Sequence, residues 1–190
     1  MMDPRVGYLA VSLLTFSAVN ALHASVTQDC SAHMPRSTPN ESFELVQGGM
    51  AVHKETGLKW ARCLVGQEWE DGSCVGSPKV VRFFPQAADV AEDSNYGGYE
   101  DWRVPNIKEL ESILEYACRD PAFNLEVFDA QPAQSVLWSS TPNETGDGEM
   151  NIWTIDARTN IVGNMPMDIR PYSGYPEYHF THVRLVRDPE

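Results

Sequence analysis

The sequence predicts a single α+β domain, and the order of its apolar patterns supports that fold class. Apolar residues alternate with polar ones near both ends of the chain, as in half-buried strands, whereas two segments with helical spacing lie in the middle. Strands that precede and follow a pair of helices, rather than alternating with helices one by one, are typical of α+β folds. The chain behind its N-terminal segment, about 165 residues, is long enough for one hydrophobic core but not for two.

The first 24 residues have the pattern of a secretory signal peptide. A short start containing Arg5 precedes an apolar run from Val6 to Val19, and Ala24 is a small residue at the expected cleavage point. The run is shorter than the roughly 20 apolar residues of a membrane helix, so we expect cleavage, with an uncleaved anchor as the alternative, and no membrane insertion afterwards. The expected organisation is a signal over 1–24, an irregular lead-in over 25–41 and a folded domain over 42–188.

Short strands are expected at both ends of the folded domain. Phe43–Val46 and Met50–His53 flank a Gln-Gly-Gly turn and predict a hairpin, and a third strand over Thr56–Trp60 follows the next turn. The three later candidates are Val136–Ser140, Asn151–Ala157 and His182–Val186.

Two helices are expected between these groups of strands. The first runs from Pro85 to Asp93, with proline in its first turn and alanines for close packing. The second begins after Asn106, which caps it, and Glu109 completes a capping box. Its apolar stripe consists of Ile107, Leu110, Ile113, Leu114 and Ala117.

Four cysteines indicate an oxidising compartment, because an even number of cysteines in an exported chain favours disulfides over free thiols. Four cysteines permit three pairings. Cys63 and Cys74 bracket a glycine-containing turn that can bring them together, which leaves Cys30 for Cys118. In the chain-entropy model the longer link contributes about 4 kcal/mol and the shorter one about 3 kcal/mol. A zinc site is disfavoured because the spacing contains no C-x-x-C pair, and we expect a periplasmic or extracellular protein.

The net charge argues against two classes of partner. Twenty-seven acidic residues against 14 basic ones give a formal charge of −13. Such a chain repels polyanions, and its few lysines and arginines form no cluster in the sequence. Neither nucleic acid nor an anionic membrane surface is therefore an expected partner.

Seven short motifs follow one another between residues 43 and 187, and the most specific is the Asp-Trp-Arg-Val-Pro-Asn run at 101–106, directly before a helix. The seven are Thr-Gly-Leu-Lys-Trp-Ala-Arg-Cys at 56–63, Gly-Gln-Glu-Trp at 66–69, Gly-Ser-Cys at 72–74, Gly-Tyr-Glu-Asp-Trp-Arg-Val-Pro-Asn-Ile-Lys-Glu-Leu at 98–110, Pro-Ala-Phe-Asn at 121–124, Leu-Trp-Ser-Ser at 137–140 and Val-Arg-Leu-Val-Arg at 183–187. In this order they resemble the Legionella collagen-like protein C-terminal domain family, a former domain of unknown function.

The resemblance implies a C-type-lectin-like fold, with two helices packed on small antiparallel sheets, the first and last strands paired, and a long variable loop region that carries ligand contacts. The family commonly carries these cysteine positions, which supports the pairing above. Some relatives are adhesins for sulfated polysaccharides, but the acidic charge argues against a polyanionic ligand here. We therefore expect an exported, non-enzymatic binding or adhesion module that presents a loop surface to a glycan or protein at a cell surface. The alternative is a structural or accessory subunit of a surface or secreted assembly.

The expected ligand surface lies between residues 160 and 180. This segment mixes methionine, arginine and aromatic residues with proline and glycine and has little regular pattern, a composition typical of adaptable contact surfaces. A long ordered loop that covers the sheet accounts for the same composition equally well. The candidate ligand-binding residues are Arg170, Tyr172, Tyr175, Tyr178 and His179.

The tryptophans and the Asp101-Trp102-Arg103 cluster favour structural roles. Trp102 prepares the start of the second helix, and we expect Arg103 to be held by buried carbonyls or by Asp101. A place in the core is favoured over a role as a sugar platform for the tryptophans Trp60, Trp69, Trp138 and Trp153.

No cofactor and no catalytic residue is expected. His179 and His182 are three apart in a strand-like run, so their side chains point to opposite faces and do not share a metal. No serine or cysteine has the context of an activated nucleophile, and the reactive cysteines of formylglycine-generating enzymes, which share the broad fold, have no expected counterpart. Weak calcium candidates in an acidic loop, where solvated side chains are the favoured interpretation, are Glu144, Asp147, Glu149 and Asn151.

Overall fold

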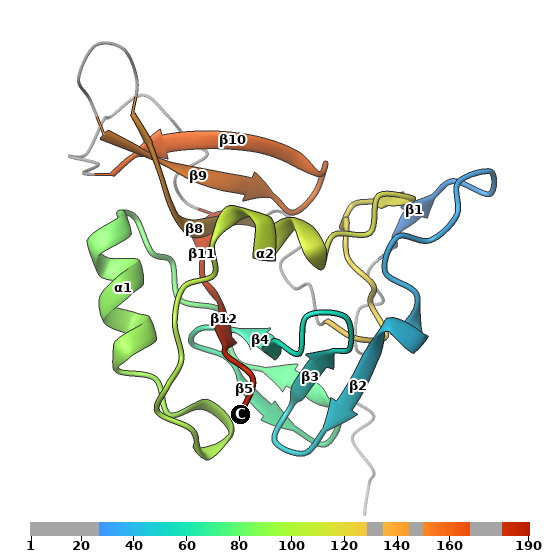
Figure 1. Ribbon diagram of the computed structural model, residues 1–190, viewed down its shortest axis with the longest axis horizontal. Helices are drawn as coiled ribbons and strands as arrows, with labels where there is room; N and C mark the ends of the chain where they lie inside the picture. The colour runs from blue at the N-terminus through green and yellow to red at the C-terminus, as the bar shows by residue number, and fades with distance from the viewer. Residues whose placement is uncertain (1–26, 129–134, 145–149, 168–179) are drawn as a thin grey trace, which may run out of the picture.

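The computed structural model describes residues 27–128, 135–144, 150–167 and 180–190, and within them the predicted α+β class is confirmed (Figure 1). The helical elements are η1 Asn40–Ser42, α1 Phe84–Glu92, η2 Tyr96–Gly98 and α2 Ile107–Ser112, where η marks a 3-10 turn. In chain order the strands are β1 Asp29–Cys30, β2 Phe43–Val46, β3 Met50–His53, β4 Lys59–Leu64, β5 Glu68–Glu70, β6 Ser73–Val75, β7 Cys118–Arg119, β8 Val136–Glu144, β9 Met150–Asp156, β10 Ile161–Pro166, β11 Thr181–His182 and β12 Arg184–Arg187.

One antiparallel sheet has the strand order β12-β4-β3-β2. The predicted β2–β3 hairpin is confirmed, with Phe43 opposite His53. β4 begins three residues later than the expected strand, at Lys59, because Gly57 has a φ of 72° and its N–H donates to the carbonyl of His53 in a turn.

The expected pairing of the first and last strands is wrong. β12 lies beside β4, whereas β2 is at the opposite edge of the same sheet and β1 pairs with β7. The β2–β3–β4 meander leaves the outer side of β4 free for a further strand, and Arg184 anchors β12 there. Its guanidinium donates to the carbonyl of Ala61 at 2.9 Å and to that of Arg62 at 2.7 Å.

The second sheet has the order β10-β9-β8-β11 and is mixed, because β11 runs parallel to β8 while the other pairs are antiparallel. The sequence does not predict β10, because residues 160–180 lack regular alternation. The expectation that the first part of this segment is irregular is therefore wrong. Asn160, with a φ of 64°, turns the chain after β9, and backbone pairing along β9 then imposes the extended conformation on Ile161–Pro166.

The capping box predicted for α2 is confirmed. The N–H of Glu109 donates to the side-chain oxygen of Asn106 at 3.0 Å, and the Glu109 carboxylate accepts from the N–H of Asn106 at 2.7 Å. The helix ends at Ser112, earlier than its apolar stripe predicts. Leu114 instead forms a β-bridge with Phe123, so the last part of the stripe is buried without being helical.

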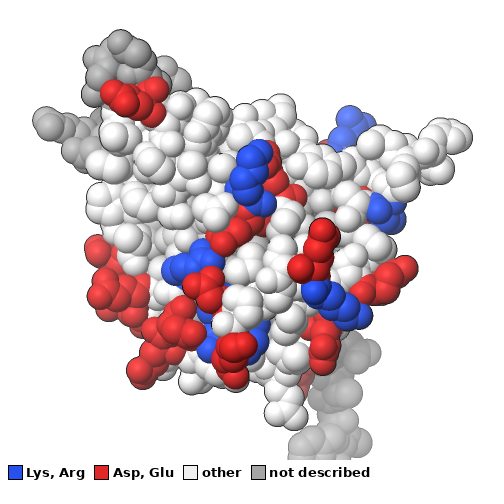
Figure 2. Space-filling view, viewed as in Figure 1, with Lys and Arg blue, Asp and Glu red and all other residues white. Residues whose placement is uncertain are grey.

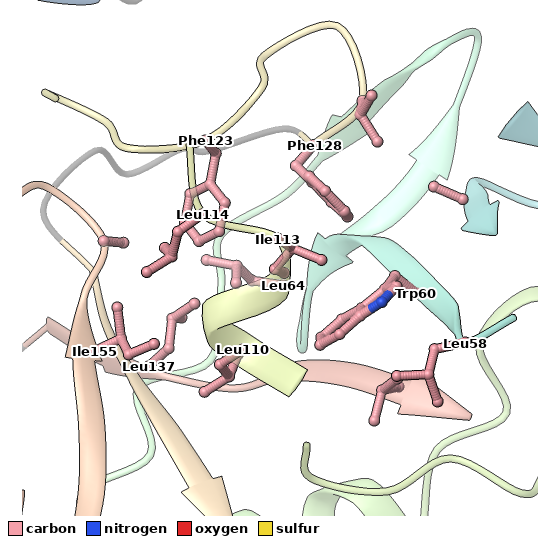
Figure 3. Packing of buried hydrophobic residues seen from close by; sticks show 14 of the residues in the cluster. Leu58, Trp60, Leu64, Leu110, Ile113, Leu114, Phe123, Phe128, Leu137 and Ile155 are labelled. Atoms are coloured by element: carbon pink, nitrogen blue, oxygen red, sulfur yellow. The ribbon is translucent and has the colours of Figure 1, made fainter. Parts of the chain in front are cut away.

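The core lies around α2, between the two four-stranded sheets (Figure 1). In Figure 3, Leu110 on α2 and Ile113 directly after it lie among Trp60 on β4, Leu137 on β8 and Ile155 on β9, all of them fully buried. Burial of this many large apolar side chains is the main favourable term for folding. A second cluster joins α1 to the sheets through apolar side chains that include Ala87, Val90, Trp102 and Trp138.

Residues 27–41 are fastened to the segment from Leu114 to Glu126. β1 pairs with β7, where Cys30 lies opposite Cys118 and forms a disulfide with it. The side chain of Gln28 donates to two backbone carbonyls, at 2.7 Å and 2.6 Å. Among the described residues, no helix has the length and apolarity needed to cross a membrane.

Candidate functional site

A disulfide-linked hairpin forms one wall of a surface groove. The hairpin joins β5 to β6 through Asp71 and Gly72, whose φ angles of 47° and 90° belong to a tight two-residue turn. The expected Cys63–Cys74 disulfide is present, as is the Cys30–Cys118 link, so the predicted pairing is confirmed. Because Cys63 lies on β4, the bond holds the hairpin against the main sheet.

Trp69, directly opposite Cys74 on the hairpin, is the main aromatic side chain of this wall. The guanidinium carbon of Arg62 lies 4.1 Å from the centroid of the indole. The same guanidinium donates to the carbonyls of Val127 at 2.5 Å and Glu126 at 3.1 Å. The cation that packs on Trp69 is therefore itself held in place, and the half-buried indole has a defined position.

Tyr96 comes from the glycine-rich turn after α1 and lies close to Trp69. Its hydroxyl donates to the carbonyl of Gly49 at 2.9 Å, and a Cβ atom at Gly49 would collide with both Trp69 and Tyr96. Trp102 fixes the turn from the other side, since its indole N–H donates to the carbonyl of Tyr96 at 2.8 Å. Burial raises the pKa of Tyr96, against smaller opposing effects, so its hydroxyl keeps its proton at neutral pH.

The groove lies between the hairpin and the C-terminal end of α1 and has a volume of about 520 Å³, within the usual range for ligand pockets. Its lining combines the two aromatic rings with polar side chains from several elements. Among the described residues, no hydrogen bond or ion pair engages the side chains of Glu68, Lys79, Asp93 and Asn95. The groove thus offers carboxylate, ammonium and amide groups beside a fixed aromatic surface.

Comparison with known families places this geometry in context. Residues 49–187 match the sequence model of the family described as the Lcl C-terminal domain, which is more than half of the chain. The chain belongs to this family. No curated protein and no solved structure matches it. All groove residues named above lie inside the Lcl C-terminal domain, whereas residues 27–41 precede the matched range.

The ligand residues proposed from the sequence are not among the residues that the structure describes. Arg170, Tyr172, Tyr175, Tyr178 and His179 lie outside the described residues. The neighbouring His182 is 2% exposed on β11, and burial lowers its pKa, opposed by a smaller effect of a backbone hydrogen bond.

Two of the four calcium candidates lie in the described part of the Lcl C-terminal domain. Glu144 and Asn151 are on the neighbouring strands β8 and β9, and the side chain of Asn151 donates to Asn164 at 2.8 Å. Asp147 and Glu149 lie outside the described residues. Within the described ranges, no group of three or more acidic, histidine or cysteine side chains could hold a metal ion.

The Asp101-Trp102-Arg103 cluster joins the last strand to the start of α2. Arg103 makes two hydrogen bonds of 2.8 Å to the Glu109 carboxylate and another to Asp188, so the expectation that buried carbonyls or Asp101 hold it is wrong. Asp101 instead accepts from Arg187 at 2.7 Å and 2.9 Å. The Arg103–Glu109 and Asp101–Arg187 pairs are each bidentate, so they are more favourable than a contact between Asp101 and Arg103.

The sequence interpretation missed Tyr96 and Asn95 and ranked Trp69 second as a ligand platform. The sequence predicts only a helix-ending turn at Tyr96-Gly97-Gly98. One available signal was the spacing of an aromatic residue beside consecutive glycines, since Gly97 and Gly98 both have positive φ angles and hold the turn in one conformation. The presence of Asn95 and Trp69 in one groove depends on packing between distant segments and leaves no local pattern.

Proposed function

We propose that this Lcl C-terminal domain is an exported, non-enzymatic binding module with a C-type-lectin-like fold, which holds a glycan or a protein ligand. The groove beside Trp69 is the observation that carries the proposal. Its size fits a small ligand or a short segment of a larger one. Its aromatic surface lies beside polar groups that have no partner among the described residues, a mixture typical of a recognition site.

The rigidity of the groove supports binding over a purely structural role. Trp69 is held by Arg62, Tyr96 is held by Gly49 and Trp102, and the Cys63–Cys74 disulfide closes the hairpin. Side chains that are fixed before a ligand arrives lose little conformational entropy on binding. A purely structural role does not require these fixed aromatic side chains to border an open groove.

The cysteine chemistry supports a non-enzymatic protein outside the cytoplasm. All four cysteines are paired, which leaves no thiol for the cysteine-dependent reactions of formylglycine-generating enzymes. Disulfides of this kind persist in oxidising compartments, so the periplasm and the extracellular space are the proposed locations. The C-type-lectin-like assignment is supported by the two helices and by a last strand that joins the sheet of β2 and β3.

A binding screen tests the proposal. The chain from residue 25 onward is applied to a glycan array and used in pull-downs from cell-surface extracts, beside the variants W69A and Y116A. Tyr116 is an exposed aromatic residue outside the groove and serves as the matched control. We expect a bound glycan or protein that W69A loses and Y116A retains.

The same screen separates the competing expectations. A triple variant, Y172A/Y175A/Y178A, tests the surface predicted from the sequence independently of the groove. Failure of the unchanged chain to bind any glycan or protein, together with co-purification in a large complex by light scattering, would replace the proposal with a structural subunit. Reaction of the native chain with a thiol reagent would reveal a free cysteine and would support cysteine-dependent catalysis instead.

A further inference from the structure

We infer that the groove binds an uncharged pyranose, stacked on Trp69 and hydrogen-bonded by the surrounding polar side chains, and that it rejects polyanionic glycans. This inference rests on the proposed function and narrows its ligand class.

The aromatic wall suits a sugar ring. A pyranose has an apolar C–H face that packs on an indole, while its hydroxyl edge remains available for hydrogen bonds. Trp69 is half-buried and belongs to the groove lining, so it supplies apolar surface next to solvent. Arg62 and the disulfide-linked hairpin hold the indole before a ligand arrives, so stacking requires little further ordering.

The polar groups around the indole match hydroxyl groups better than they match an anionic group. Glu68 and Asp93 only accept hydrogen bonds when ionised, Lys79 only donates, and the amide of Asn95 does both. A sugar hydroxyl both donates and accepts, so each of these four groups can use one. A sulfate or carboxylate has acceptor oxygens only and cannot satisfy the two groove carboxylates.

The charge near the groove opposes a polyanion. Asp89 and Glu92 on α1 and Asp93 at its end are exposed, and Figure 2 shows acidic side chains along this helix. Lys79 is the basic residue of the groove lining, and the whole chain carries a formal charge of −13. A sulfated chain that entered the groove would therefore meet net repulsion.

A cationic ligand is disfavoured for a different reason. The Arg62 guanidinium already packs on Trp69, and Lys79 lies in the groove lining. A second cation placed on the indole would be repelled by both of them. The groove carboxylates of Glu68 and Asp93 attract a cation placed beside them, but the indole face itself is opposed to one. Stacking on Trp69 therefore favours an uncharged sugar ring.

Titration calorimetry with defined oligosaccharides tests the inference. The probes are three uncharged tetrasaccharides (cellotetraose, maltotetraose and N-acetylchitotetraose), the cationic deacetylated chitotetraose, and heparin as the polyanion. We expect at least one uncharged probe to bind, and a Kd that changes less than about twofold between roughly 50 mM and 500 mM NaCl. Heparin and deacetylated chitotetraose are expected not to bind.

Variants assign the binding to the groove. W69A is expected to weaken the uncharged probe by about tenfold or more, W69F by less, and N95A by several-fold, while Y116A binds as the unchanged chain does. Near-ultraviolet circular dichroism of each variant verifies folding. N95A keeps the test decisive if W69A fails to fold, because Asn95 is exposed and has no side-chain partner among the described residues.

Each remaining outcome counts against the inference. Binding of heparin with a steep salt dependence, binding of the cationic probe alone, or uncharged-probe binding that is indifferent to W69A and N95A would overturn it. Binding of a surface protein with no response to any sugar would overturn the sugar assignment and leave the proposed function standing. If no sugar and no protein binds, both the sugar assignment and the proposed function are rejected.

Discussion

Glu115 is a buried carboxylate that is held by several hydrogen bonds. It is 0% exposed, and its carboxylate accepts from the N–H groups of Ala117 at 2.9 Å and of Ser37 and Thr38, both at 3.1 Å. The hydroxyls of Ser37 and Thr38 add two further bonds. Burial alone raises the pKa of Glu115, but these hydrogen bonds together outweigh it and hold the pKa below its ordinary value of 4.5.

The substitution E115Q should therefore destabilise the domain. An amide cannot accept at both ends, so at least one donor of Ser37, Thr38 or Ala117 is left unsatisfied, at a cost of about 2 kcal/mol. Urea unfolding at pH 7 measures this loss. The matched control is E100Q, an exposed glutamate without a side-chain partner among the described residues, for which we expect no measurable change.

The pH dependence of the free energy of unfolding, measured for the unchanged chain and for E115Q, tests whether charge causes the destabilisation. Because the folded-state pKa of Glu115 is depressed, its contribution is present above pH 4.5 and is lost as the pH falls through the folded-state value. The stability gap between the unchanged chain and E115Q should narrow below about pH 4.5. A gap that stayed constant down to acid unfolding would show that packing, not charge, causes the effect of E115Q.

At the scale of elements, α2 depends on its first turn. The helix is only six residues long, and short helices are marginal without capping and tertiary packing. The side chains of Asn106 and Glu109 each accept a hydrogen bond from the other residue's backbone N–H. The Glu109 carboxylate also accepts a hydrogen bond from the Arg103 guanidinium. The capping box therefore links the helix to the segment that bridges β12.

Replacement of the cap, N106A, should lower the free energy of unfolding by about 1 kcal/mol because the N–H of Glu109 loses its acceptor. Denaturant titration gives the value. The control K108A removes an exposed ion pair with Glu111 on the same helix and should change stability by less than about 0.5 kcal/mol. Equal effects of the two substitutions would mean that the capping geometry contributes nothing specific.

The β5–β6 hairpin is the element on which the groove depends. Its disulfide closes a separation of 11 residues, from Cys63 to Cys74. The double variant C63A/C74A should lose up to about 3 kcal/mol and free the hairpin from β4. Trp69 fluorescence should then become more solvent-like, and binding to the groove should weaken. Loss of stability with unchanged ligand affinity would show that Arg62 alone suffices to place the indole.

At the scale of the whole molecule, the folded unit extends beyond the range of the family match. Residues 27–41 lie before residue 49, where the match begins, yet they supply Cys30 and the donors of Ser37 and Thr38. The carboxylate of Glu115 is buried beneath this segment. The segment thus completes the hydrogen bonds of a residue inside the family domain.

A chain that begins at Ser42 should therefore be less stable than one that begins at residue 25, by more than the disulfide alone explains. The comparison variant is C30A/C118A, which removes the 88-residue link but keeps the segment and should lose about 4 kcal/mol or less. The truncated chain should lose roughly 2 kcal/mol more, because Glu115 also loses its donors. Thermal unfolding of the chain from residue 25, the chain from Ser42 and C30A/C118A measures these losses. Equal losses for the last two would mean that the segment stabilises the domain only through the disulfide of Cys30.

Features whose physical causes lie within a few residues could be predicted from the amino-acid pattern alone. The Gln-Gly-Gly turn predicts the β2–β3 hairpin, Asn106 and Glu109 predict the capping box, and the short loop predicts the Cys63–Cys74 link. Turn conformation, capping and closure of a short loop are local preferences, so they can be identified in the chain before any packing is known.

Features that depend on contacts between distant segments became evident only in the folded molecule. β10 exists because β9 pairs with it, β12 lies beside β4 rather than β2, and Asp101 binds Arg187 rather than its neighbour Arg103. The groove likewise brings Trp69 and Tyr96 together from two elements across Gly49. Such contacts form between segments that pack side by side without being close in sequence, and their energies depend on geometry that no local pattern encodes.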